Sequence, residues 1–156
     1  MRVTLCVVGR LRGGPERSLI DDYLTRFDRT GRALGLGPAN VIEVEDKSKQ
    51  GMAAEAKLLL AAAPENATLI GLDERGKQQT SPQFAQSLGQ WRDDGIRDCA
   101  FLIGGADGLD PSLRADTNHL LSFGKMVWPH MLARVMLSEQ LYRAASILAG
   151  APYHRE

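Results

Sequence analysis

The chain has 156 residues, of which 44% are hydrophobic and 24% charged, and its 19 lysines and arginines balance its 19 aspartates and glutamates. This length and composition are typical of one domain, residues 1–156, with a sizeable core. The zero net charge argues against a protein that binds nucleic acid by bulk electrostatics. No apolar run approaches the roughly 20 residues of a membrane span, and the N-terminus lacks a signal-peptide pattern, so we expect a cytoplasmic protein.

Short apolar runs alternate with segments of helical periodicity along the chain. In the first part, apolar runs predict strands at residues 2–8 and 41–44, and helical spacing predicts helices at residues 18–30 and 50–63. A glycine-rich basic loop, residues 9–15, separates the first strand from the first helix.

The second part continues this alternation. It predicts a strand at 68–72, a polar loop at 73–77 and a helix from Ser81 to about Asp94, at whose start Thr80 and Gln83 stand at capping-box spacing. It then predicts a strand at 99–103, a short helix at 111–117, a strand at 119–122, a loop at 122–128 and a helix at 129–149. Strands that alternate with helices indicate the α/β class, so we predict a mostly parallel sheet with helices on both faces. Cys6 and Cys99 fall in predicted buried strands and are expected to be unpaired.

The strand at 99–103 leads directly into Gly104, Gly105 and Gly108, and Asp110-Pro111 then starts a helix. Glycine permits positive φ and lets a ligand approach the backbone. The spacing matches neither a dinucleotide-binding fingerprint nor a phosphate loop. From this stretch alone, a ligand-binding turn and a tight connection without a ligand are equally compatible with the sequence.

Three predicted strand ends are expected to lie close together in space: Leu72-Asp73, residues 103–105 and the loop at 122–128. In a parallel sheet the carboxyl ends of neighbouring strands meet at one edge, where ligands bind. Backbone groups and apolar side chains at this edge suit a neutral adenine ring. The three histidines, at 119, 130 and 154, lack the spacing of zinc ligands, so we expect no metal.

Near the C-terminus, the segment Tyr153-His154-Arg155 offers an aromatic ring, an imidazole and a guanidinium. These groups suit an RNA base and its phosphates, although a frayed polar tail is the commoner outcome for terminal residues. Glu139 precedes Arg143 by four residues, which indicates a surface ion pair. Basic residues gather near both ends of the chain, and they form either a local basic surface or ordinary solvated charge.

Several segments match one family: residues 5–9, 72–77, 101–109, 129–135, Glu139-Gln140-Leu141-Tyr142-Arg143-Ala144 and Pro152-Tyr153-His154-Arg155-Glu156. The sequence resembles the bacterial 23S rRNA (pseudouridine-1915-N3)-methyltransferase family, whose members are small SPOUT (trefoil-knot) methyltransferases. The matching segments are spread over the whole chain. The resemblance implies a C-terminal trefoil knot, an exception to the rule that chains are unknotted.

The resemblance also implies S-adenosylmethionine as cofactor, held by Leu72, Gly104, Gly105, Phe123, Gly124, Lys125, Met126, Val127, Trp128 and Pro129. Lys125 stands where the family often has another residue type. The family is dimeric, with the cofactor pocket of one subunit near the tail of the other. Its substrate is a pseudouridine in 23S rRNA of the assembled ribosome.

The reaction implied is methyl transfer to N3 of pseudouridine, for which the protein aligns two reactants and helps to remove the N3 proton. His154 is the first candidate for the base or for orienting the ring, Tyr153 for stacking on the base, and Arg155 for gripping phosphate. Two alternatives stay open: a SPOUT methyltransferase of tRNA, and a ribosome-binding or nucleotide-binding module without catalysis.

Overall fold

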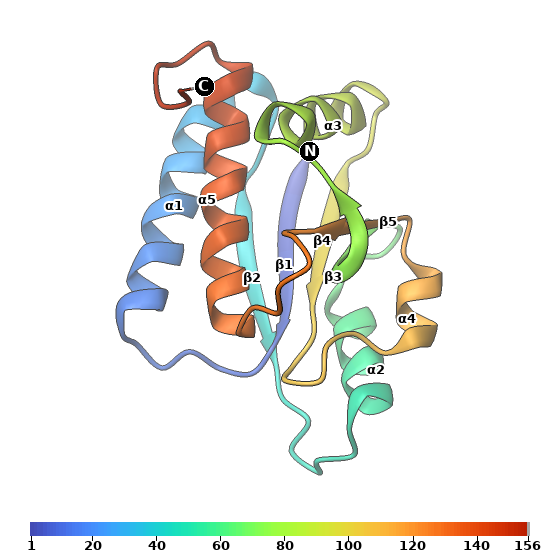
Figure 1. The fold of residues 1–156 in the computed structure, drawn as a ribbon. Helices are drawn as coiled ribbons and strands as arrows, with labels where there is room; N and C mark the ends of the chain where they lie inside the picture. Colours follow the sequence, from blue (N-terminus) through green and yellow to red (C-terminus); the bar gives the residue numbers. More distant parts are fainter. Residues whose placement is uncertain (156) are drawn as a thin grey trace.

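The computed structural model describes residues 1–155 and contains one five-stranded sheet (Figure 1). The strands are β1 (Arg2–Val8), β2 (Ala39–Val44), β3 (Thr68–Gln78), β4 (Asp98–Ile103) and β5 (His119–Ser122), in the spatial order β2-β1-β4-β3-β5. All four strand pairings are parallel, which confirms the predicted sheet. The trefoil knot stays a prediction.

Helices cover both faces of the sheet, as predicted. The helices α1 (Pro15–Gly31), α3 (Ser81–Asp93) and α5 (His130–Leu148) pack on one face, whereas α2 (Met52–Ala62) and α4 (Pro111–Asp116) pack on the other. A short 3-10 helix, Arg32–Leu34, follows α1. The helices α1 and α5 lie side by side (Figure 1).

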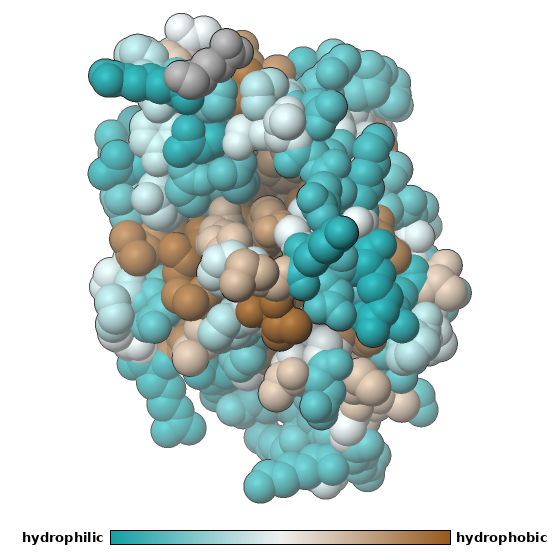
Figure 2. Space-filling model, in the orientation of Figure 1, coloured by the Kyte–Doolittle hydropathy of each residue, from teal (hydrophilic) through white to brown (hydrophobic). Residues whose placement is uncertain are grey.

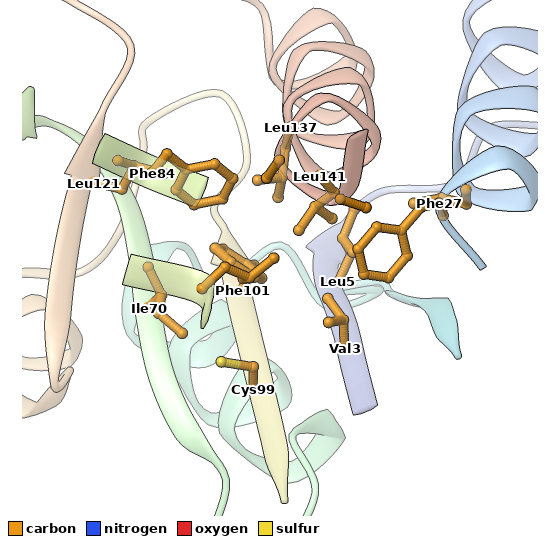
Figure 3. Packing of buried hydrophobic residues seen from close by; sticks show 14 of the residues in the cluster. Val3, Leu5, Phe27, Ile70, Phe84, Cys99, Phe101, Leu121, Leu137 and Leu141 are labelled. Atoms are coloured by element: carbon orange, nitrogen blue, oxygen red, sulfur yellow. The ribbon is translucent and has the colours of Figure 1, made fainter. Parts of the chain in front are cut away.

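The alternation of side chains along β1 explains why the molecule has two apolar cores. Val3, Leu5 and Val7 face the larger core under α1, α3 and α5, whereas Cys6 and Val8 face the smaller core under α2 and α4. In the larger core, Phe101 of β4 lies among side chains from three helices, and its ring meets that of Phe84 edge-on (Figure 3). This two-sided burial accounts for the continuous apolar runs that predicted β1 and β4.

Most helix boundaries follow local signals in the sequence. Thr80 and Gln83 form the predicted capping box before α3, and the Asp110 side chain caps α4 by accepting from the N–H of Ser112. The helix α1 begins at Pro15 rather than at Ser18, because proline is well suited to the first turn of a helix. Cys6 and Cys99 are buried and unpaired, as expected.

The strand β3 is longer than predicted, and the loop predicted at 73–77 is wrong. The strand continues to Gln78, with a register shift between Leu72 and Lys77, and its last residues pair with β5. A Cβ on Gly76 would lie 2.7 Å from the carbonyl carbon of Leu121. Glycine therefore allows the two backbones to approach, and the polar sequence at 73–77 conceals this because its partner is distant in the chain.

Within residues 1–155, no helix is both long and apolar enough to span a bilayer.

Candidate active site

A cavity of about 260 Å³ lies where the carboxyl ends of β4 and β5 and the middle of β3 meet the start of α5. This is the edge at which parallel sheets bind ligands. The lining combines backbone, apolar side chains and a few charges, and consists of Leu72, Asp73, Glu74, Arg75, Ile103, Gly104, Gly105, Ala106, Asp107, Gly108, Leu121, Phe123, Gly124, Met126, Val127, Trp128, His130 and Ala133. We call it the strand-end cavity.

The floor of the strand-end cavity is a turn that only glycine can build. A Cβ on Gly104 would lie 2.3 Å from the carbonyl oxygen of Gly108, so the turn folds back onto the strand end. The N–H of Gly108 donates to the carbonyl oxygen of Gly105, at 3.1 Å, and Gly108 has a φ of +80°. The glycines thus give a bare backbone surface at the edge of the cavity.

Glu55, on α2, supports this turn from behind. A Cβ on Gly105 would lie 2.9 Å from Oε1 of Glu55, so the carboxylate approaches the glycine backbone directly. Burial raises the pKa of Glu55, and the nearby carboxylates of Asp46 and Asp107 raise it further, whereas the hydrogen bond from the Gly105 N–H lowers it. No pattern in the sequence predicts this contact, because Glu55 has the features of an ordinary helical residue.

Charged groups on β3 add polarity to the opposite wall. The Asp73 carboxylate is almost fully buried and lies 3.3 Å from Nη1 of Arg75 and 3.4 Å from Nη1 of Arg114. Asp73 follows the predicted strand end directly, so the rule that placed Leu72 at this edge places Asp73 there as well.

A buried arginine ties the start of α5 to the end of β1. Arg134 is 1% exposed, and its Nη2 donates to the carbonyl oxygens of Val8 and Gly9. The same Nη2 lies 3.3 Å from Nδ1 of His130, which lines the cavity. Burial lowers the pKa of both Arg134 and His130, and the arginine charge lowers that of His130 further. Arg134 is one of the basic residues near the C-terminal end, for which the sequence indicated surface charge, because an arginine within a helix gives no sign of burial.

The structure brings eight of the ten predicted cofactor residues to the strand-end cavity. Leu72, Gly104 and Gly105 line it together with Phe123, Gly124, Met126, Val127 and Trp128. Lys125 and Pro129 belong to the same loop but are not among the lining residues. Gly124 has a φ of +118°, which fits glycine and turns the loop back over the cavity.

The predicted catalytic residues lie elsewhere. Gly150, with a φ of +66°, ends α5, and the chain then turns back so that Tyr153 and His154 pack against that helix. Arg143, which contacts His154, is 13 residues beyond His130, or about 20 Å along the helix axis. In Figure 1 the C-terminus accordingly lies at the end of α5 remote from its start. The structure therefore does not bring the tail to the cavity of its own chain.

The tail is held by a cluster of side chains that we call the tail clamp: Glu139, Arg143, Tyr153 and His154. One carboxylate oxygen of Glu139 accepts from the Tyr153 hydroxyl at 3.0 Å and from Nε and Nη2 of Arg143 at 2.9 and 2.6 Å. Burial raises the pKa of Tyr153, and the contact with Glu139 raises it further. The predicted surface ion pair between Glu139 and Arg143 is present, but it is only partly exposed and also organises the tail. Arg155 is exposed.

The loop over the cavity and the first turns of α5 expose large apolar side chains. Val127 is 81% and Met126 74% exposed, and Trp128, Met131 and Leu132 are also exposed. Figure 2 shows hydrophobic surface gathered in the middle of this face. Apolar surface of this kind marks an interaction site more often than a solvated one.

The ends of the chain do not form one basic surface. Arg2 pairs with Asp98, Arg10 with Glu45, and Arg17 with Asp21 and Glu43, while Arg134 is buried. Within residues 1–155, no group of three or more histidine, cysteine or acidic side chains could hold a metal ion.

Over residues 1–154, the sequence matches the family described as "Predicted SPOUT methyltransferase". The chain belongs to the SPOUT methyltransferase family. It is also similar to proteins named "Ribosomal RNA large subunit methyltransferase H". Those of Dinoroseobacter shibae and Ruegeria pomeroyi are 72% and 70% identical over 155 residues, which cover 99% of this chain and 99% of each relative. The relative of Cereibacter sphaeroides is 61% identical with the same coverage. These matches confirm the family that the sequence motifs predicted.

Proposed function

We propose that this protein is an S-adenosylmethionine-dependent methyltransferase that modifies N3 of a pseudouridine in 23S rRNA of the assembled ribosome. The observation that carries the proposal is the strand-end cavity, in which the glycine turn and the loop at 123–128 enclose one space. Relatives with 60–72% identity over almost their whole length are named as methyltransferases of the large-subunit RNA. The substrate class rests on those names and on the sequence motifs.

The lining of the strand-end cavity fits the proposed cofactor. S-adenosylmethionine supplies an electrophilic methyl group on a sulfonium, and it carries a net positive charge. Asp107 lines the cavity and suits that charge, whereas Asp73 and Glu74 are paired with Arg75. The glycine backbone at 104 and 105 offers N–H and C=O groups, and the apolar side chains of the loop suit a flat aromatic ring.

The chain's own residues would then bind, align and exclude water. The glycine turn forms one wall of the site, because it directly follows β4 and folds back on itself between Gly105 and Gly108. Val127 and Trp128 line the cavity at the protein surface. Alignment of two reactants is the main requirement of a transfer between a reactive donor and an RNA base. The tail that carries Tyr153, His154 and Arg155 is the segment that we propose for contact with the RNA.

We also propose that the active unit is a homodimer, in which the tail of one subunit acts at the strand-end cavity of the other. Two observations support this. The tail is docked about 20 Å along α5 from the cavity-lining His130 of its own chain. The exposed apolar side chains at 126–132 offer a surface for a second copy beside the cavity.

Methyl transfer from radiolabelled S-adenosylmethionine tests the proposed reaction. The substrates are intact ribosomes that lack the modification, their isolated subunits, and tRNA. We expect label in the 23S rRNA of intact ribosomes, at N3 of a pseudouridine. Label in tRNA would instead favour a tRNA methyltransferase of the same fold. Binding of the cofactor without label in any RNA would indicate a binding module.

A mixing experiment tests the shared site. Gly104→Ala disables the cavity, and Tyr153→Ala/Arg155→Ala disables the tail. Each variant alone is expected to be inactive. If the tail acts across the dimer, mixed dimers contain one complete site and activity returns on mixing. If the tail acts within its own chain, the mixture stays inactive.

A further inference from the structure

We propose that Glu139 and Arg143 are positioning residues that hold the tail for methyl transfer, and that His154 is one of the held groups rather than the base that takes the N3 proton. This inference rests on the proposed function, since it concerns the same reaction. It is carried by the contacts of the tail clamp.

Glu139 is the centre of the tail clamp. Its Oε1 accepts three hydrogen bonds, one from Tyr153 and two from Arg143. The Arg143 guanidinium also lies over the Tyr153 ring, 4.8 Å from the centroid, and that ring packs against Tyr142 with centroids 4.4 Å apart. Hydrogen bonds to charged groups are the stronger kind, so a tail that would otherwise fray is held against α5.

The contact between Arg143 and His154 fixes the role of each ring nitrogen. Nη1 of Arg143 lies 3.3 Å from Nδ1 of His154. A guanidinium has donors and no acceptor, so Nδ1 accepts and the ring proton is on Nε2. Nε2 is buried, and it has no hydrogen-bond partner among residues 1–155.

Neither nitrogen of His154 is therefore available to a substrate in the docked tail. Nδ1, the one with a free electron pair, is occupied by Arg143, and Nε2 carries a proton and is covered. A general base needs an accessible lone pair within hydrogen-bond reach of the proton that it takes. Arg155, by contrast, is exposed in the docked tail.

The reaction balances without a histidine base. The N3–H bond breaks and its proton passes to solvent hydroxide, which leaves a negative imide nitrogen. The lone pair on N3 then forms the bond to the methyl carbon as the carbon–sulfur bond breaks onto sulfur. The guanidinium of Arg155, which directly follows the clamped His154 and is exposed, can stabilise the negative imide.

The first test compares His154→Asn with His154→Ala in the ribosome methylation assay. Asparagine places an acceptor oxygen near the position of Nδ1, but its amide cannot act as a base. We expect kcat of the Asn variant to stay within about tenfold of the wild type, as for the change of a single hydrogen bond, and kcat of the Ala variant to fall further. A base would show equal losses of about 10²-fold or more in both variants, and that result would overturn the proposal.

The second test observes His154 directly by nitrogen-15 NMR. The chain has three histidines, so His154→Asn assigns the signals. We expect an imidazole proton on Nε2 that exchanges slowly with water and an unprotonated Nδ1. In Glu139→Ala we expect loss of the slow proton and a drop in kcat, with unchanged cofactor affinity and a cooperative thermal transition. An Nδ1-protonated ring, or a rapidly exchanging proton in the wild type, would contradict the tail clamp.

Asp21→Asn is the matched control, because it breaks the exposed i,i+4 ion pair between Arg17 and Asp21 on α1. It is expected to change neither the NMR signal nor kcat. The two proposals fail differently. A wild type that shows the protected ring but methylates no ribosome would reject the proposed function and keep the tail clamp, whereas active enzyme with a free ring would reject only the tail clamp.

Discussion

The two ends of α5 hold their functional groups in different ways. At the start, the strand-end cavity is built largely from backbone: a glycine turn, a stretch of β3 and a loop that adds apolar side chains. At the other end, the tail clamp is built from side chains, with one carboxylate joining an arginine and a tyrosine. The cavity is therefore sensitive to any added atom, and the tail clamp is sensitive to the loss of a particular hydrogen-bonding group.

This difference fits the roles that we propose for the two ends of α5, cofactor binding at its start and RNA contact at its end. A cofactor that is bound in the same way each time suits a rigid site inside the sheet. An RNA that arrives from solution suits a tail that is ordered but can adjust, because local structure with few buried contacts opens at lower free energy than the core. The following changes separate the two ends, beginning with the largest expected effect.

Gly104→Ala is expected to disable the cavity and leave the tail clamp intact. The added Cβ would lie 2.3 Å from the carbonyl oxygen of Gly108, which is backbone and cannot move aside cheaply. Overpacking of this kind costs up to about 3 kcal/mol, so we expect cofactor affinity, measured by calorimetry, to fall about a hundredfold. The protected His154 proton should persist.

Gly95→Ala is the control for a glycine-to-alanine substitution that causes no steric clash. Gly95 has a φ of +83°, but nothing lies within 4 Å of its Cβ position. It precedes β4, at the end of the strand opposite to the cavity. We expect a loss of roughly 1 kcal/mol in stability with unchanged cofactor affinity. Equal effects of the two substitutions on affinity would mean that the turn does not shape the site.

Two arginines of α5 provide the next comparison. Arg134→Ala leaves the buried carbonyl oxygens of Val8 and Gly9 without this donor, and we expect the free energy of unfolding to fall by about 2 kcal/mol. Arg143→Ala removes a partly exposed ion pair, and we expect a loss of less than about 1 kcal/mol. Urea unfolding measures both. A larger loss for Arg143 would show that the tail clamp supports the whole fold.

Sequence reasoning placed the cavity correctly because its parts are local. The glycine turn and the loop at 123–128 each follow the end of a strand, and parallel pairing brings such ends to one edge whatever the details of packing. The third wall, residues 72–75, lies inside β3 rather than at its end. The continuous apolar runs of β1 and β4 predicted the central strands of the sheet, and the capping residues Thr80 and Asp110 predicted the starts of α3 and α4.

The parts that escaped prediction depend on contacts between distant residues. Gly76 extends β3 only because Leu121 comes within reach. Glu139 organises the tail only because the chain reverses after Gly150 and returns Tyr153 to the same helix. Arg134 is buried because β1 ends beneath it. A single sequence shows these residue types without showing their partners.

The cavity end should also respond to mild acid through His130. Burial and the charge of Arg134 lower its folded pKa below the ordinary value of 6.5. Below pH 6.5 the unfolded chain binds a proton that the folded chain does not, so stability is lost as the pH falls from 6.5 toward the folded pKa. Urea unfolding at pH 5 and pH 7.5 should show a smaller pH dependence in His130→Gln than in the wild type. An equal dependence in both proteins would place the titration elsewhere.

Lys125→Ala should have the smallest effect on the cavity. The sequence motifs place Lys125 among the cofactor residues, but its exposed side chain is not part of the lining, although its neighbours on both sides are. Exposed substitutions usually change free energies by less than about 0.5 kcal/mol, so we expect cofactor affinity to stay within about twofold. If methylation of ribosomes falls while that affinity holds, the lysine acts on RNA phosphate, and the loss should shrink as salt is raised. A tenfold loss of cofactor affinity would instead mean that the loop closes over the cofactor with Lys125 turned inward, and the cavity would then depend on a side chain as the tail clamp does.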